Sequence, residues 1–203
     1  MRKRIRAAGI TAAALAAVLA LGATPASAAP TWTVTGGGAA SGAATNFQVI
    51  VSGTGIISCT STTLSGTTPS GSGLPGTALI SFSSASWTGC TALGTPFTIA
   101  ASDLPWKFNG SSYNSSTGTT AGTITGVEIN LSSTFCSAYF AGTSPTAPAT
   151  LTGTYVNSTH TLTVTGGNLH VYDVVGCFGL LANGDSATYS AAYQTGTLQI
   201  TSP

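Results

Sequence analysis

The stretch Thr159–Cys177 constrains the fold most, because its side chains alternate regularly in character. Leucine and valine alternate with threonine before Gly166–Asn168, and Leu169 and Val171 alternate with polar residues after it. Successive side chains of a β-strand point to opposite faces, so each run has one apolar and one polar face. Two such runs around a Gly-Gly-Asn turn predict a β-hairpin that leads directly into Cys177.

Similar alternating runs recur through the rest of the chain, separated by residues that favour turns. They predict an all-β fold, an antiparallel β-sandwich or barrel of roughly a dozen short strands. Beyond residue 28 no segment shows the period of an amphipathic helix. Three segments rich in Ser, Thr, Gly or Pro are predicted to be loops: Gly66–Gly76, Gly110–Gly122 and Thr143–Thr150.

Residues 1–28 have the composition of a secretory signal peptide. Basic residues among the first six precede the Ala/Leu/Val-rich segment 7–22, and Ala26-Ser27-Ala28 is a small-residue cleavage site. A membrane anchor is the competing interpretation, but the strongly apolar run is shorter than the ~20 residues that span a bilayer. We therefore expect a secreted, extracellular protein with no membrane anchor after cleavage, and a single all-β domain over residues 29–203.

The predicted mature chain carries very little charge. Lys107 is its single basic residue, against Asp103, Glu128, Asp173 and Asp185, so one positive and four negative charges sum to −3 with neutral histidines. One cation cannot form a basic patch, which excludes nucleic acid and anionic membrane surfaces as partners. A surface of Ser, Thr, Gly, Asn and Gln suits hydroxyl-rich ligands instead.

Four cysteines, all in the predicted mature part, indicate two disulfides with three possible pairings. We expect Cys59 to pair with Cys90 and Cys136 with Cys177, because each pair then joins neighbouring strands within one half of the chain. No CxxC pair or Cys/His cluster is present, so no metal and no cofactor are expected.

The two halves of the chain are weakly alike. Each contains a strand leading into a cysteine, a glycine six or seven residues later, a proline-containing loop, and a Gly-Cys dipeptide, Gly89-Cys90 or Gly176-Cys177. A duplicated unit and a composition shared by any two Gly/Thr-rich β segments both account for this. An internal pseudo-repeat therefore stays an open interpretation.

No group of residues predicts catalysis. The tripeptide at 184–186, Gly-Asp-Ser, resembles the nucleophile motif of trypsin-like serine proteases, and His170 and Asp173 precede Ser186 in the order of that triad. The glycines that follow the serine in that family are missing, and a segment this short cannot supply the separate loops that build the triad. The esterases with a similar Gly-Asp-Ser motif carry it near the start of an α/β fold. We interpret Asn183-Gly184-Asp185 as a turn.

The other polar candidates are equally weak. A glycosidase needs two facing carboxylates, but the four acids are expected to be solvated strand-face or turn residues, with Glu128 on a polar face. Calcium at Asn183 and Asp185 lacks the Asp-x-Asp-x-Asp run typical of such sites. His160 and His170 are interpreted as polar-face residues rather than ligands.

Four aromatic residues are the best ligand-binding candidates: Trp106, Trp87, Trp32 and Tyr113. Sugar rings stack on such side chains through their C–H faces, while Asn and Thr bond the hydroxyls. Core packing is the competing interpretation for each tryptophan. Trp106 is preferred because it follows Pro105, which predicts an accessible edge or the beginning of a strand.

One group of motifs extends over nearly the whole predicted mature chain. They are Trp32-x-Val34, Cys59, Gly89-Cys90, Pro105-Trp106, Gly122-x-Ile124-x-Gly126, Cys136, Gly153-x-Tyr155-x-Asn157, Leu162-x-Val164, Gly176-Cys177 and Gly184-Asp185. The pattern resembles small exported actinobacterial two-disulfide β-proteins of unassigned function, and its motifs are structural. Composition is also similar to secreted actinobacterial cellulose-binding modules, which differ in length and cysteine placement, so no binding residue is transferred.

Two functions fit these observations. The first is a secreted, non-enzymatic β domain that binds polysaccharide or a cell-envelope surface. The alternative is a structural or self-associating extracellular surface protein, because strands with a single lysine lack the usual charged protection against pairing with other chains.

Overall fold

The computed structural model describes residues 31–51 and 55–202, and every regular element in them is a β-strand. The all-β prediction is therefore confirmed. The predicted signal peptide, residues 1–28, lies outside the described residues. None of the described residues forms a helix long and apolar enough to cross a membrane.

The strands are β1 (Trp32–Thr35), β2 (Gly38–Ala44), β3 (Phe47–Val51), β4 (Gly55–Cys59), β5 (Ser61–Thr68), β6 (Gly71–Leu74), β7 (Ile80–Thr88), β8 (Cys90–Ala92), β9 (Thr95–Ser102), β10 (Trp106–Asn114), β11 (Thr119–Ser132), β12 (Ser137–Ala141), β13 (Ala149–Val156), β14 (Thr161–Thr165), β15 (Leu169–Val175), β16 (Ser186–Thr195) and β17 (Gln199–Thr201).

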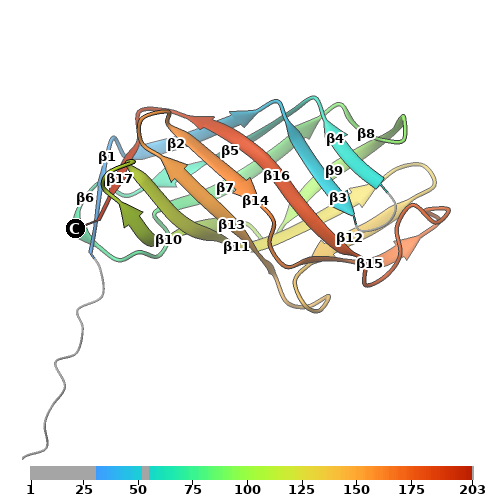
Figure 1. The fold of residues 1–203 in the computed structure, drawn as a ribbon. Coiled ribbons are helices and arrows are strands. Elements are labelled where there is room, and N and C mark those ends of the chain that lie inside the picture. Colours follow the sequence, from blue (N-terminus) through green and yellow to red (C-terminus); the bar gives the residue numbers. More distant parts are fainter. Residues whose placement is uncertain (1–30, 52–54, 203) are drawn as a thin grey trace, which may run out of the picture.

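Most of these strands are halves of longer ones. β2 continues into β3, β4 into β5, β7 into β8, β9 into β10, β12 into β13 and β14 into β15, while β11 and β16 run the whole length. These six composite strands and two long ones pair antiparallel in chain order. β16 also pairs with β2 and β3, so the sheet closes on itself as an elongated barrel (Figure 1).

A separate sheet covers one end of this body. Its strand order is β17-β1-β6, and it holds both the first described strand and the last (Figure 1). Trp32 of β1 is buried beneath it, close to Gly76 and Gly110. The connections β8–β9, β11–β12 and β15–β16 lie at the opposite end, which we call the loop end.

The predicted hairpin over Thr159–Cys177 is wrong, although its two faces are right. β14 and β15 do not pair with each other; both pair with β16, as consecutive parts of one interrupted strand. Gly166 and Gly167 have positive φ and kink this strand without reversing it. Asn168 holds the kink to the neighbouring strand, because its Oδ1 accepts a hydrogen bond from the Thr150 backbone N–H at 2.7 Å.

Two predicted loops are largely strands. Most of Gly66–Gly76 belongs to β5 and β6, and most of Gly110–Gly122 to β10 and β11. Threonine favours strands, and in a sheet with one face in water Ser and Thr can fill the outward positions without loss. The low apolar content of these two segments reflects the solvent-exposed face of the sheet, so the prediction of loops is wrong for most of their residues.

Both predicted disulfides are present, Cys59–Cys90 and Cys136–Cys177. In the order of the eight long strands, Cys59–Cys90 joins the second and third, and Cys136–Cys177 bridges the beginning of the sixth and the end of the seventh. Each disulfide thus joins the second and third strands of its own four-strand half of the sheet. The likeness between the halves in sequence therefore has a counterpart in strand order.

We predict that Gly66→Ala destabilises the protein by about 2 kcal/mol or more. A Cβ at Gly66 would lie 1.8 Å from the backbone oxygen of Ser81 on the neighbouring strand β7, where the register shifts. Gly196→Ala is the matched control, because a Cβ there meets nothing within 4 Å, and it should change stability by less than about 0.5 kcal/mol. Urea unfolding measures both, and equal effects of the two variants would contradict the prediction.

We further predict that replacing Cys136 and Cys177 by alanine lowers the free energy of unfolding by about 4 kcal/mol, from the loop-closure entropy of a long disulfide-closed loop. The two residues are 41 positions apart in sequence. Urea unfolding of oxidised wild type and variant gives the difference. Adding reductant to the wild type should produce at least the same loss, and a loss below about 1 kcal/mol would contradict the entropic argument.

Candidate functional site

The structure corrects the expectation that tryptophans form a sugar-stacking platform. Trp32 and Trp106 are each only 1% exposed. Trp106 lies on the same inward face of β10 as Phe108, and Trp32 is covered by the end sheet. Rings of this size stabilise the fold most when they are buried, so neither presents a face to a surface ligand.

The other two candidates are partly buried and do not complete a platform. Trp87 packs against the core, with its ring centroid 6.1 Å from that of Trp106 and 6.0 Å from that of Phe47. Its Nε1 is buried without a hydrogen-bond partner, the one such side-chain atom among the described residues. Tyr113 also packs against the core, at the end of β10 that leads into β11.

Glu128 lies on the face that the alternation predicts, together with exposed Asn130, but it is covered there and only 4% exposed. A register shift lies between Thr125 and Val127, at Gly126, whose φ is positive. After it Val127 and Ile129 are buried on the opposite face, so the alternation holds and only the expected solvation of Glu128 is wrong. Burial raises the pKa of the Glu128 carboxyl above its usual value, while Tyr139 lowers this pKa and Asp103 raises it.

Glu128 and Asp103 do not form an accessible pair of carboxyls. Asp103 raises the pKa of Glu128, but a glycosidase needs both acids to flank the substrate, and Glu128 is only 4% exposed. The pKa of Tyr139 is raised by burial and by Glu128, so this phenol stays neutral. We interpret the cluster as a structural one.

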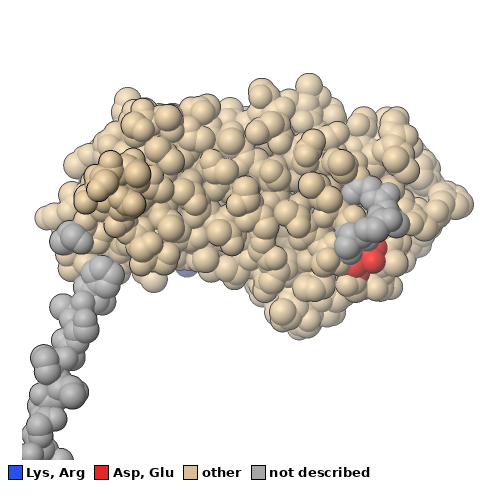
Figure 2. Space-filling model, viewed as in Figure 1, with Lys and Arg blue, Asp and Glu red and all other residues tan. Residues whose placement is uncertain are grey.

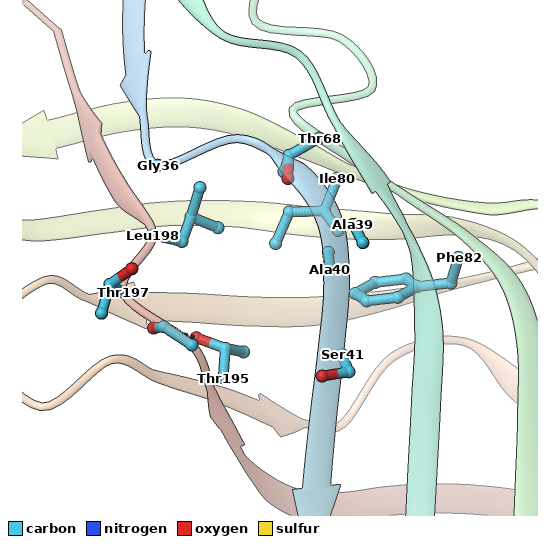
Figure 3. A pocket seen from close by; sticks show the side chains of 11 residues that line it. Gly36, Ala39, Ala40, Ser41, Thr68, Ile80, Phe82, Thr195, Thr197 and Leu198 are labelled. Carbon is cyan, nitrogen blue, oxygen red and sulfur yellow. Dashed lines mark hydrogen bonds between the residues drawn. The ribbon is translucent and has the colours of Figure 1, made fainter.

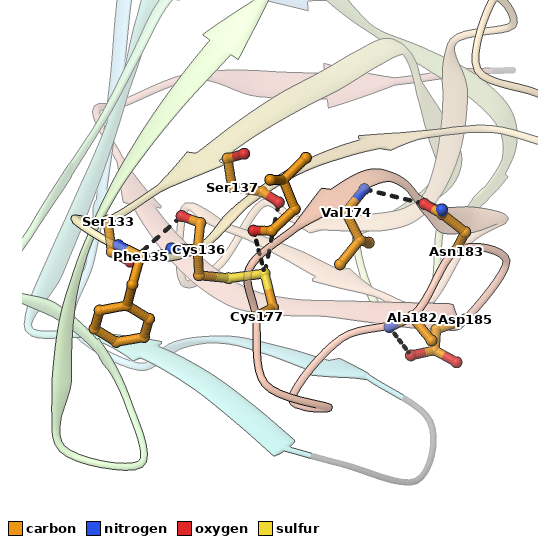
Figure 4. Close-up of a disulfide and its surroundings, with 10 residues drawn as sticks. Ser133, Phe135, Cys136, Ser137, Val174, Cys177, Ala182, Asn183 and Asp185 are labelled. Atoms are coloured by element: carbon orange, nitrogen blue, oxygen red, sulfur yellow. Dashed lines mark hydrogen bonds between the residues drawn. A yellow bond between two sulfur atoms is a disulfide. The ribbon is translucent and has the colours of Figure 1, made fainter.

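The polar residues near Ser186 serve the turn that precedes β16. Asp185 Oδ2 accepts a hydrogen bond from the Ala182 N–H at 2.8 Å, and Asn183 Oδ1 accepts one from the Val174 N–H at 3.0 Å (Figure 4). His170 is the cross-strand neighbour of Ser186, but its Nδ1 bonds the Asn168 carbonyl at 3.0 Å. No group of three or more His, Cys, Asp or Glu among the described residues has the geometry to hold a metal ion.

The loop end carries an apolar surface that the sequence did not predict. Leu93 and Phe178 are 79% and 88% exposed, and Phe135 is 42% exposed. We call these three residues the loop-end patch. They border a hollow of about 380 Å³ whose floor includes Phe97 and Leu180. Single exposed apolar residues are ordinary, but three around one hollow indicate a contact surface.

Leu93 and Phe178 stand in turns that disfavour them. Leu93-Gly94 and Phe178-Gly179 each have positive φ at both residues, as a type I′ turn requires at its two central positions. The first turn joins β8 to β9, and the second is closed by a bond from the Leu180 N–H to the Cys177 carbonyl at 2.9 Å. Asn-Gly is the preferred pair for this geometry. Leu93 and Phe178 therefore destabilise the fold in two ways, through an unfavourable backbone conformation and through exposure of apolar side chains to water. A role in contact with a partner would explain both.

The Cys136–Cys177 disulfide holds the two aromatic members of the patch together. Phe135 immediately precedes one cysteine and Phe178 immediately follows the other. Their ring centroids are 5.7 Å apart. Figure 4 shows Phe135 beside this disulfide, with the Ser133 hydroxyl accepting a 3.0 Å bond from the Cys136 N–H. The disulfide thus keeps the backbone of the two phenylalanines close together.

The surface of the protein carries few charges. The described residues include one lysine and four acids, and the face in Figure 2 is nearly all uncharged, with acidic atoms visible towards the loop end. A contact made at the loop-end patch is therefore governed by apolar area and local hydrogen bonds, without long-range attraction of a charged partner.

A family model described as "Alkane oxidation protein activator PraA/PraB-like" matches residues 1–200. The chain belongs to this family. No curated protein and no solved structure matched it. This membership is consistent with the expected resemblance to a family of small β-proteins, and the description of the family refers to an activator.

The sequence of this PraA/PraB-like protein does contain a signal for the patch. Leu93-Gly94 and Phe178-Gly179 each place an apolar residue directly before glycine in a two-residue connection. Asn or Asp is the usual residue at that position, so an apolar residue there is a sign of an exposed apolar side chain. Composition alone hides it, because apolar residues are expected to lie in the core.

We predict that stability falls as the pH rises from about 4 towards neutral, in part because of Glu128. Its pKa is higher in the folded than in the unfolded chain, so folding favours the protonated form. That contribution is complete below the unfolded pKa and is lost as pH rises through the folded pKa. Glu128→Gln should flatten this dependence in urea unfolding measured across pH. Asp185→Asn, at an exposed turn, is the control, and an unchanged slope in Glu128→Gln would contradict the assignment.

Proposed function

We propose that this protein is an exported, non-enzymatic binding domain that adsorbs to apolar surfaces through the loop-end patch, with liquid alkane as its target. The carrying observation is the pair of exposed apolar side chains in left-handed turn positions. The family description, which refers to alkane oxidation, supports the choice of alkane. Extracellular location and actinobacterial origin are part of the proposal, and two disulfides are compatible with the former.

The architecture supports adsorption in three ways. The patch lies at one end of an elongated body, so it can contact a surface while the sides of the barrel remain in water. The disulfide keeps the backbone of Phe135 and Phe178 close together, which limits the conformational entropy lost on contact. The scarcity of charged side chains lowers the cost of bringing the surrounding face near a medium of low dielectric constant.

The structure gives different support to the two functions expected from the sequence. Polysaccharide binding loses its main support, since Trp32 and Trp106 are buried. Self-association by strand pairing is weakened because the closed sheet leaves few free edges. Self-association through the patch is kept as the second candidate, since an apolar hollow of this kind also fits a second copy.

The test is adsorption of the purified, oxidised protein to hexadecane droplets, measured by depletion from the aqueous phase. Leu93→Asn with Phe178→Asn should weaken adsorption about tenfold or more, because two exposed apolar side chains are lost. Asparagine is favoured in left-handed turn positions, so this double variant should be at least as stable as wild type.

The matched control is Ile50→Thr with Ile56→Thr. This pair faces outward across β3 and β4, is 43% and 49% exposed, and keeps β-branched side chains in the variant. Its adsorption should equal that of wild type. Equal losses in both double variants would show general hydrophobicity instead of a site. Dimerisation that vanishes with the patch, without adsorption to droplets, would replace the proposal by self-association.

A further inference from the structure

We propose that a hollow between β2 and the segment Thr195–Leu198 is a binding site for a small neutral alcohol. The hollow has a volume of about 170 Å³ and lies at the end opposite the patch (Figure 3). This inference does not rest on the proposed function, because the two sites share no residue.

The hollow exists because two paired strands part. β2 pairs with β16 only at Ala43 with Gln194 and at Gly42 with Thr195. After Thr195 the chain no longer pairs with β2, and its next strand, β17, pairs with β1 instead. β2 itself continues to Gly38 with β5 as its neighbour. A wedge-shaped gap therefore opens beside the first residues of β2, beneath the end sheet.

The floor of the hollow is apolar. Ile80, Phe82 and Leu198 are buried core residues whose side chains line it, and Ala39 and Ala40 form one wall. Apolar cavities of about 150 Å³ in proteins stay dry and bind a molecule the size of benzene. A space of about 170 Å³ therefore suits a hydrocarbon group of about six carbon atoms.

Four hydroxyl side chains line the hollow, those of Ser41, Thr68, Thr195 and Thr197, and Thr68 is the one nearest its apolar floor. Thr68 is only 7% exposed, and Figure 3 shows its oxygen pointing towards the space between Ile80 and Leu198. This oxygen has no hydrogen bond to any of the other residues drawn in Figure 3. It is not a fully buried atom without a partner, as Trp87 Nε1 is, but faces the hollow, where a ligand hydroxyl can replace water as its partner.

The lining excludes charged ligands. None of the residues around the hollow is acidic or basic, and an ion without a counter-charge is costly to bury in such a place. The ligand class that remains has one hydroxyl and a short hydrocarbon body. 1-Hexanol represents it, with its hydroxyl on Thr68 and its carbon chain against Phe82 and Leu198.

The test is titration of the purified, oxidised protein with 1-hexanol, followed by NMR of the Ile80 and Leu198 methyl groups. We expect saturable shifts at both. Thr68→Val keeps the shape of the side chain and removes its hydroxyl, so it should weaken 1-hexanol binding about fivefold while n-hexane binding stays unchanged. Thr68→Ser should restore the affinity for 1-hexanol.

A second variant blocks the hollow. Ala40→Leu places a larger side chain in its wall and should abolish the shifts. The Leu93→Asn and Phe178→Asn double variant should bind 1-hexanol like wild type, which separates this site from the patch. Absence of saturable shifts in wild type would overturn the inference. So would equal affinity in wild type, Thr68→Val and Ala40→Leu.

Discussion

The pairing of β16 with β2 and β3 is the interaction on which the rest of the structure depends. It joins the last long strand to the first and turns a meander into a closed sheet. Closure gives nearly every strand two neighbours, which satisfies backbone hydrogen bonds without the charged residues that usually protect edges. A chain with so few charges can therefore remain a β protein with its apolar face inside.

Closure also explains which inferences from the sequence hold. Leu162, Val164, Leu169 and Val171 were assigned to one apolar face, and all four are buried. The disulfide pairing was predicted because cysteines close in sequence lie on adjacent strands of a meander. Both results follow from local alternation and chain order, which the sequence contains directly.

The failures come from features that alternation does not contain. Gly166–Asn168 has the composition of a reversing turn, yet Asn168 bonds Thr150 on the next strand and the chain continues forward. Glu128 keeps the face that alternation predicts but is covered there, and only 4% of it is exposed. Pro105 predicts an edge or the beginning of a strand, and β10 does begin at Trp106; β10 is paired on both sides, however, so Trp106 is not at an accessible edge. Each error concerns a long-range partner, and a single sequence does not identify those.

β1 and β17 are paired neighbours, with Thr33 opposite Thr201, so both chain ends of the described fold leave the body side by side. Figure 1 places them at the end opposite the β8–β9 and β15–β16 connections. A tether, a label or another domain attached to either terminus would therefore lie at the end of the body opposite the loop end. Immobilisation through a terminus would leave the patch accessible.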